Sequence, residues 1–135
     1  MDLPMYLMLL ADAHSNVSQT EEGLKHLDEA ARIVEVTKAR CVEAEMLRIR
    51  AKLLTIAGNV AAAEKSLRTA IAVAQSQHSK LWELRAATSL GRLWLDQGKR
   101  TETRDLLAPI YGWFTEGFDT LDLKEAKALL EQLKA

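Results

Sequence analysis

The residues that could do chemistry are few and poorly spaced for it. A phosphate-binding loop needs glycines at fixed intervals, followed by lysine and then serine or threonine. Gly98 is followed by Lys99 and Arg100, so arginine stands where a magnesium-binding hydroxyl belongs, and Gly91 lies at the wrong distance. The sequence therefore contains no nucleotide-binding loop of this kind.

The sequence also contains no residue pattern typical of a metal site or of an activated nucleophile. His14, His26 and His78 lie far apart, with no histidine or cysteine spacing typical of zinc. Cys41 is the only cysteine, and no motif that would activate its thiol lies beside it. No nucleophile, base and orienting group can be assembled from the remaining polar residues. We expect a non-catalytic protein without a metal or another cofactor.

Composition narrows the class of protein further. The 135 residues are 48% apolar and 27% charged, and the formal net charge is -1. These values are ordinary for a globular protein and give no basic excess for nucleic acid. No stretch reaches the roughly 18 apolar residues of a membrane span. The single cysteine favours the cytoplasm, and the acidic Asp2 and Asp12 argue against a signal peptide.

The chain repeats itself at a spacing of forty residues. Leu7 recurs as Leu47, and Ser18 is matched by Gly58 and Gly98. Other positions repeat in the same register: Ala11, Ala51 and Gly91; Leu27, Leu67 and Leu107; Ala30, Ala70 and Ile110. A fixed period between about 20 and 50 residues indicates a stacked array in which each unit is one supersecondary element.

Helical periodicity dominates each unit. We expect helices over about residues 2–16, 18–36, 38–57, 59–77 and 79–97, another from residue 101, and a last one from residue 119 or 120 to the C-terminus. Side chains suited to cap a helix N-terminus precede four of them: Ser18 with Glu21, Asn59, Ser79, and Asp119 or Thr120. Gly58 and Gly98 suit left-handed C-caps, so each unit should be an antiparallel helix pair.

These residues resemble a tetratricopeptide repeat over about residues 4 to 117. The family pairs leucine with a small residue in its first helix, as Leu10-Ala11 and Leu90-Gly91 do, and Trp94 fits a following aromatic position. Its second helix carries a small residue and then a large and small pair, matched by Gly23, Ala63 and Thr103, and by Leu27, Leu67 and Leu107 with Ala30, Ala70 and Ile110. The sequence departs from the family pattern at Arg50, where leucine is expected, and in its longer period.

The resemblance implies an all-α fold, a right-handed α-α superhelix of three helix pairs with a C-terminal capping helix. The whole of residues 1–135 would form one domain. Its repeats would cover about residues 3–37, 38–78 and 79–117, and the cap residues 120–134. The C-terminal part is also similar to the end of bacterial multidomain proteins that join an ATPase module, sometimes with a nucleotide-cyclase domain, to a repeat array.

In such arrays the first helices of successive units line a concave face. The resemblance places these residues there: Met8, Asp12, Arg48, Lys52, Thr55, Arg85, Thr88 and Arg92. Four of the eight are basic in a chain that is nearly neutral, so this face could hold acidic side chains or a peptide carboxylate. The alternative is a solvated charged face, partly neutralised by Glu45 and Asp96.

Two apolar clusters raise the question of further contacts. The first helix is apolar nearly all round, which predicts a homodimer or packing against earlier repeats of a parent chain, through Leu3, Met5, Tyr6, Leu9 and Leu10. Near the other end, an aromatic cluster either packs beneath the capping helix or forms an exposed hot spot for a partner: Tyr111, Trp113, Phe114 and Phe118.

We therefore expect a protein–protein interaction scaffold in bacterial signalling, which presents a pre-ordered surface to a protein or peptide segment. The alternative is an effector-sensing segment of a larger ATPase, cyclase or transcription regulator. Neither nucleic acid nor a membrane is an expected partner.

Overall fold

A computed structural model describes residues 20–37 and 42–134, and all of its regular structure is helical. The helices are α2 (Thr20–Thr37), α3 (Glu43–Ile56), α4 (Val60–Ser76), α5 (Lys80–Asp96), α6 (Arg100–Gly112) and α7 (Leu121–Lys134). The helix predicted for residues 2–16, the capping residue Ser18 and the predicted dimer contacts lie outside the described residues, as do Cys41 and two of the predicted concave-face residues, Met8 and Asp12.

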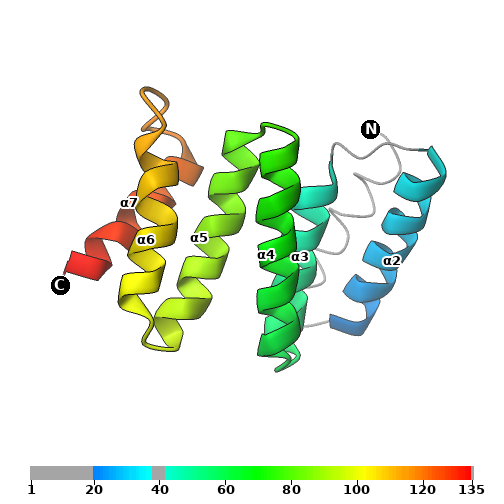
Figure 1. Ribbon diagram of the computed structural model, residues 1–135. Coiled ribbons are helices and arrows are strands. Elements are labelled where there is room, and N and C mark those ends of the chain that lie inside the picture. Colours follow the sequence, from blue (N-terminus) through cyan, green and yellow to red (C-terminus); the bar gives the residue numbers. More distant parts are fainter. Residues whose placement is uncertain (1–19, 38–41, 135) are drawn as a thin grey trace.

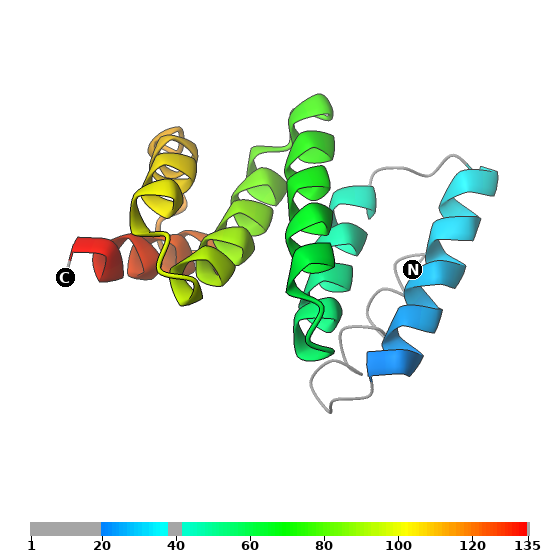
Figure 2. The same ribbon diagram turned by 60° about the horizontal axis from the view of Figure 1, so that its bottom comes forward.

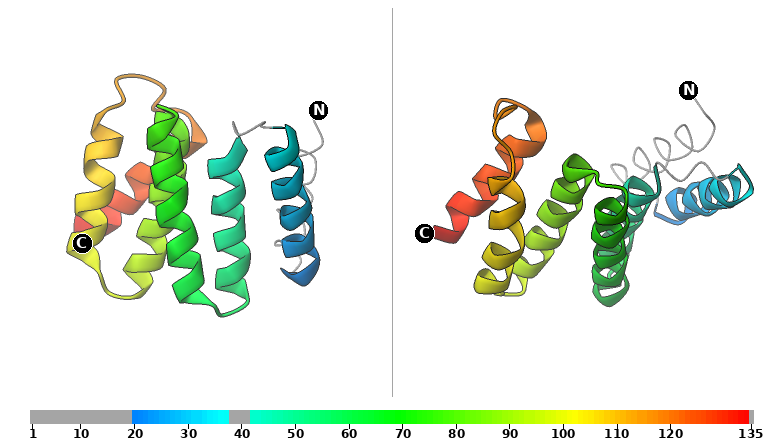
Figure 3. Two further views of the ribbon diagram at one scale, coloured as in Figure 1. Left: turned by 45° about the vertical axis from the view of Figure 1, so that its right-hand side comes forward. Right: turned by 45° about the horizontal axis from the view of Figure 1, so that its top comes forward.

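The six described helices form a row in which each packs mainly against its neighbours in sequence. Figure 1 shows the chain running up and down from α2 to α6, with α7 crossing obliquely at the end of the row. Alternate helices also meet, because α3 contacts α5 and α5 contacts α7. Figure 2 and Figure 3 show the same row from other sides. None of the described helices has both the length and the apolar character needed to cross a bilayer.

Three turns of identical construction reverse the chain in this row. In the α3–α4 turn the Gly58 amide donates to the Thr55 carbonyl and the Asn59 amide donates to the Leu54 carbonyl. These are the two bonds of a Schellman motif, which satisfies the last carbonyls of a helix. The same two bonds recur in the next two turns. In the α4–α5 turn the His78 amide donates to the Gln75 carbonyl and the Ser79 amide to the Ala74 carbonyl. In the α5–α6 turn the Gly98 amide donates to the Leu95 carbonyl and the Lys99 amide to the Trp94 carbonyl.

The residue at the centre of each turn has a positive φ: 86° at Gly58, 56° at His78 and 78° at Gly98. The predicted glycine C-caps are confirmed, while His78 occupies the left-handed region without being glycine. The residue that follows each of them begins the next helix, since its carbonyl accepts the first intrahelical bond. One three-residue turn therefore ends one helix and starts the next.

The predicted side-chain caps are confirmed only in part. The Asn59 carboxamide oxygen accepts a hydrogen bond from the Ala62 amide at 3.3 Å, as expected. Ser79 stands at the N-terminus of α5 but its hydroxyl makes no capping bond, so that prediction is wrong. The Thr120 hydroxyl instead donates to the Gly117 carbonyl at 2.7 Å, while the Thr120 carbonyl accepts from the Lys124 amide. Of these three residues, only Asn59 makes the expected capping bond with its side chain.

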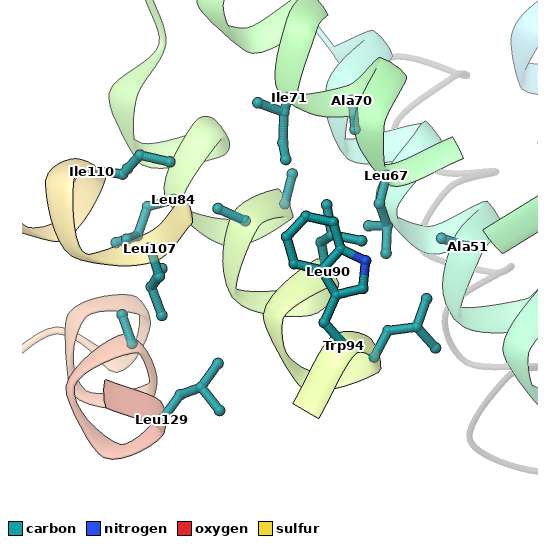
Figure 4. Packing of buried hydrophobic residues seen from close by; sticks show 14 of the residues in the cluster. Ala51, Leu67, Ala70, Ile71, Leu84, Leu90, Trp94, Leu107, Ile110 and Leu129 are labelled. Atoms are coloured by element: carbon teal, nitrogen blue, oxygen red, sulfur yellow. The ribbon is translucent and has the colours of Figure 1, made fainter. Parts of the chain in front are cut away.

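The helices bury a core at the positions that repeat in the sequence. Leu67, Leu90, Trp94 and Leu107 converge between α4, α5 and α6, and Leu129 of α7 closes the end (Figure 4). A second cluster joins α2 to α3 through Leu27, Ala30, Val42, Met46, Ile49 and Leu53. The repeated leucines at 27, 67 and 107 are all less than 4% exposed. Burial of these apolar side chains is the main force that holds successive helices together.

Small residues set how closely the helices approach. Ala51 and Gly91, which the sequence marks as crossing points, are both buried. A Cβ atom added at Gly91 would lie 3.0 Å from side-chain carbons of both Thr103 and Leu129. The α5 backbone therefore lies directly against α6 and α7 at this point, and a larger residue would push them apart.

The buried indole of Trp94 binds polar groups of α4. Its Nε1 donates to Glu64 Oε1 at 2.8 Å, and the Arg68 guanidinium lies 5.1 Å from the ring centroid. The hydrogen bond from Trp94, assisted by the charges of Arg68 and Lys99, holds the pKa of Glu64 below its ordinary value despite partial burial. This contact joins the second helix of one pair to the first helix of the next.

Replacing His78 with glycine should stabilise the protein. In the folded state, a non-glycine residue in the left-handed region destabilises the backbone by about 1–2 kcal/mol. Glycine avoids this strain, but its greater conformational freedom in the unfolded chain offsets about 0.5–1 kcal/mol of the gain. We expect His78→Gly to raise the free energy of unfolding by about 0.5–1 kcal/mol in urea titrations. As a control in the reverse direction, Gly98→Ala should lower it by the same net amount, about 0.5–1 kcal/mol. A loss of stability in His78→Gly would contradict this account of the turn.

The Glu64 carboxylate should make stability depend on acid pH. Because its pKa is lowered in the folded state, its contribution is fully present above its ordinary pKa of 4.5 and is lost as the pH falls through the lowered value. Glu64→Gln should therefore be less stable than the parent protein at neutral pH and equally stable in strong acid. Urea unfolding at several pH values measures the difference, with Glu116→Gln in the exposed α6–α7 loop as a control that should show no such dependence. A stability gap that stays constant with pH would refute this role.

Candidate functional site

One face of the row is formed by α3, α5 and α7, the helices that contact each other across the intervening α4 and α6. This face contains two adjoining hollows of about 490 and 450 Å³. Both are lined by Arg48, Lys52, Ser89, Arg92 and Glu125, so they form one continuous groove. We call it the α3–α5–α7 groove.

The two ends of this groove differ in chemistry. One hollow has an apolar side made by Ala51, Ile56, Leu67 and Leu93, and Ile56 is exposed there. The other hollow is mostly polar, and α7 adds Leu121, Asp122 and Glu125 to its wall. A ligand that fills the whole groove must therefore offer an apolar group at one end and polar or charged groups along the rest.

The residues predicted for the concave face that fall within the described residues all line this groove. Arg48, Lys52 and Thr55 come from α3, and Arg85, Thr88 and Arg92 come from α5. The hydroxyls of the two threonines are less available to bind a ligand than expected. The Thr55 hydroxyl donates to the Ala51 carbonyl and the Thr88 hydroxyl to the Leu84 carbonyl, both at 2.8 Å, and Thr88 is buried.

An ion-pair chain crosses the polar end of the groove. Glu45, which is buried in α3, accepts two hydrogen bonds from Arg48 Nε at 3.0 and 3.1 Å and a third from Arg48 Nη2. Glu45 Oε1 also lies 3.6 Å from Arg85 Nη1 of α5. Arg85 Nε in turn donates to Asp122 Oδ1 of α7 at 2.9 Å. Arg85 therefore links all three helices of this face.

A second ion pair lies further along the groove. Arg92 Nη2 of α5 is 3.4 Å from Glu125 Oε2 of α7. In this pair, and in the pair of Arg85 with Asp122, the arginine side chain is the more exposed partner: 52% against 40%, and 36% against 18%. In each pair the carboxylate side chain is thus the more covered partner, and its ion pair helps to orient the arginine.

Two more arginines hold the far end of α7. Arg100 Nη2 donates to the Gln132 carbonyl and Arg104 Nη2 to the Leu133 carbonyl, both at 2.8 Å. The last carbonyls of a helix have no partner within the helix and carry partial negative charge, so cations bind there favourably. On its apolar side α7 buries Leu123, Ala126, Leu129 and Leu133. Leu130 beside them is only partly buried against the same core.

The charge balance of the groove was foreseen only in part. Glu45 neutralises basic residues as predicted, whereas Asp96 lines the apolar hollow and the partners of Arg85 and Arg92 come from α7. Sequence reasoning missed Asp122 and Glu125 because they belong to the last helix, which was treated only as a cap. The acidic first turn of that helix was the available signal.

The aromatic cluster after α6 divides into two halves. Tyr111 and Phe114 are partly buried against the core, as packing beneath α7 requires. Trp113 and Phe118 are exposed, Trp113 to 59%. The packing interpretation therefore holds for Tyr111 and Phe114, while a partner hot spot at the exposed Trp113 and Phe118 stays a prediction.

Among the residues that the structure describes, no group of three or more His, Cys, Asp and Glu side chains could hold a metal ion. The groove contains charged and apolar side chains, two hydroxyls bound to their own helices, and Ser89. Such an arrangement can bind and orient a ligand through hydrogen bonds, charge and apolar contact.

Removing Arg85 should loosen α7 more than removing Arg92. Arg85→Met breaks a charged hydrogen bond to Asp122 and an ion pair with Glu45, both of them largely covered carboxylates, and we expect the free energy of unfolding to fall by about 1.5–3 kcal/mol. Arg92→Met breaks an exposed pair and should cost less than about 1 kcal/mol. Urea unfolding followed by circular dichroism compares the two, and equal losses would show that Arg85 does not link the helices.

Comparison with known proteins finds no match for this chain. No family model matches the sequence, and no curated protein or solved structure matches it either. The tetratricopeptide resemblance therefore stays a prediction from the residues, beside an established all-helical domain of six described helices that pack mainly in sequence order.

Proposed function

We propose that the protein is a non-catalytic interaction module that binds an acidic peptide segment of a protein partner in the α3–α5–α7 groove. In this proposal the helix pairs form a right-handed superhelix of the tetratricopeptide type, α3 and α5 are the first helices of successive pairs, and α7 is the cap. The resemblance of the sequence to repeat arrays of bacterial signalling proteins favours a role in such signalling.

The observation that carries the proposal is the layering of charge in the groove. Glu45 and Asp122 are covered, while the side chains of Arg85 and Arg92 are more exposed and line the groove. A guanidinium has five N–H donors, and each of these two arginines uses only part of that capacity in its ion pairs. A carboxylate of a partner can therefore bind them without breaking the pairs that orient them.

The apolar end of the groove adds a requirement on the sequence of the peptide that binds there. Ile56 is exposed beside Leu67 and Leu93, so a ligand gains by covering these side chains with an apolar residue of its own. The ligand that satisfies both ends carries acidic residues next to a large apolar one. Because the helices that form the groove are ordered before binding, little conformational entropy is lost by the receptor.

A small effector is the second candidate for this groove. The apolar hollow of about 490 Å³ falls within the range of about 300–1,000 Å³ that is typical of small-molecule sites. In that case the chain would act as an effector-sensing segment of a larger ATPase, cyclase or transcription regulator. A thermal shift by small metabolites, in the absence of peptide binding, would favour this second function.

Charge reversal in the groove tests the first function. The probes are two fluorescein-labelled peptides, one of alternating glutamate and leucine and one of alternating lysine and leucine. We expect the acidic peptide to bind more tightly, and the double variant Lys52→Glu with Arg92→Glu to weaken its binding at least about ten-fold. Fluorescence anisotropy gives the dissociation constants, and added salt should weaken the binding as well.

The control for this experiment is the double variant Lys65→Glu with Lys127→Glu, which makes the same charge change at exposed positions of α4 and α7 outside the groove. It should leave the affinity for the acidic peptide unchanged. Equal affinity for the two peptides, or equal weakening by the groove variant and the control, would rule out a groove built for acidic segments.

A further inference from the structure

A separate small cavity lies where the α4–α5 turn meets the end of α6. It measures about 310 Å³ and is lined by Gln75, His78, Lys80, Glu83 and Trp113. None of these residues lines the α3–α5–α7 groove, so a ligand here would be independent of one in the groove. The wall contains an exposed indole on one side and a buried carboxylate, that of Glu83, on the other.

The cavity already holds a cation supplied by the chain itself. Lys80 Nζ lies 5.7 Å from the centroid of the Trp113 ring and 3.3 Å from Glu83 Oε1. Gln75 Nε2 donates to the other oxygen, Glu83 Oε2, at 3.1 Å and so fixes the orientation of the carboxylate. An aromatic face and an oriented carboxylate together form a site for positive charge, because both attract a cation electrostatically.

A second observation concerns the rim of this cavity. His78 has a φ of 56°, whereas glycine takes the equivalent place in the turns at residues 58 and 98. A side chain at this position strains the backbone, and such strain is concentrated at sites that bind ligands. Here the strained residue is His78, which lines the same cavity as Trp113.

We propose that Trp113 and Glu83 form a receptor for an arginine side chain of a protein partner, and that Lys80 is the resident occupant which this arginine displaces. A guanidinium is planar and can stack on the indole while it donates two parallel bonds to a carboxylate, and it is more weakly hydrated than an ammonium. Lys80 is half-exposed at the first position of α5, so its flexible side chain can leave without unfolding the helix.

The test uses the full chain and three short peptides of the form acetyl-Gly-X-Gly-amide, in which X is arginine, lysine or glutamine. The readout is the chemical shift of the Trp113 indole N–H during titration. The arginine peptide should shift this signal in the parent protein, and Lys80→Ala should bind it about five- to ten-fold more tightly because the competing ammonium is gone. Lys80→Met, which keeps a long apolar stem, is measured in parallel to separate competition from lost packing.

Removal of either wall completes the test. In the Lys80→Ala background, Trp113→Ala and Glu83→Gln should each abolish binding of the arginine peptide. Because Trp113→Ala removes the indole signal, binding to these variants is followed by the backbone amide shifts of Gln75 and His78, which also line the cavity, and the rest of the amide fingerprint spectrum confirms that the fold is kept. Preference for the glutamine or lysine peptide, no shift in the parent protein, or no gain in either Lys80 variant would overturn the proposal. The groove variant of Lys52 and Arg92 should leave this binding unchanged, so failure here does not bear on the acidic-peptide function.

Discussion

The helix row depends on turns of only three residues, repeated at intervals of twenty. Each turn fixes where one helix ends and the next begins, because the Schellman bonds and the first intrahelical bond share the same residues. With turns this short, consecutive helices must lie antiparallel and in contact, and the small residues at Ala51 and Gly91 let them approach. The placing of α3 and α5 on one face follows from this constraint, since every second helix returns to the same side, whereas α7 reaches that face through the longer connection of residues 113–120.

The arginines of the candidate groove serve the fold and the surface together. Arg85 links α3 to α7 through Glu45 and Asp122, and its remaining donors point to the groove. Arg100 and Arg104 hold the other end of α7 by binding its last carbonyls. A change in these residues would therefore alter the shape of the groove as well as its charge, whereas Lys52 and Arg92 mainly alter its charge.

Much of the fold could be predicted because apolar periodicity and the glycine turns are local signals. The repeated positions at Leu27, Leu67 and Leu107 are buried, and Gly58 and Gly98 end helices as expected. Ser79 was expected to cap α5 with its hydroxyl; it does stand at the N-cap position, but its hydroxyl makes no capping bond, because the rotamer of a single side chain is not fixed by a local sequence signal. His78 was missed as a left-handed residue because histidine carries no such signal in a sequence.

The charge partners in the groove were harder to predict for a physical reason. Asp122 lies 37 residues from Arg85 in the sequence, so their pairing depends on the path of α7 across the end of the row. The sequence pattern placed the basic residues on the correct face but gave no means of deciding which carboxylates would reach them. Long-range pairing of this kind needs the tertiary structure.

The contrasting surroundings of Trp94 and Trp113 have a spectroscopic consequence. The Trp94 indole is buried between helices, with its N–H bound to Glu64 and cationic groups near its face, whereas the Trp113 indole stands in solvent. Aqueous quenchers of fluorescence can collide with the second ring and hardly with the first. Of the three tryptophans in the sequence, Trp94 is thus an optical probe for the integrity of the interior and Trp113 one for events at the outer rim.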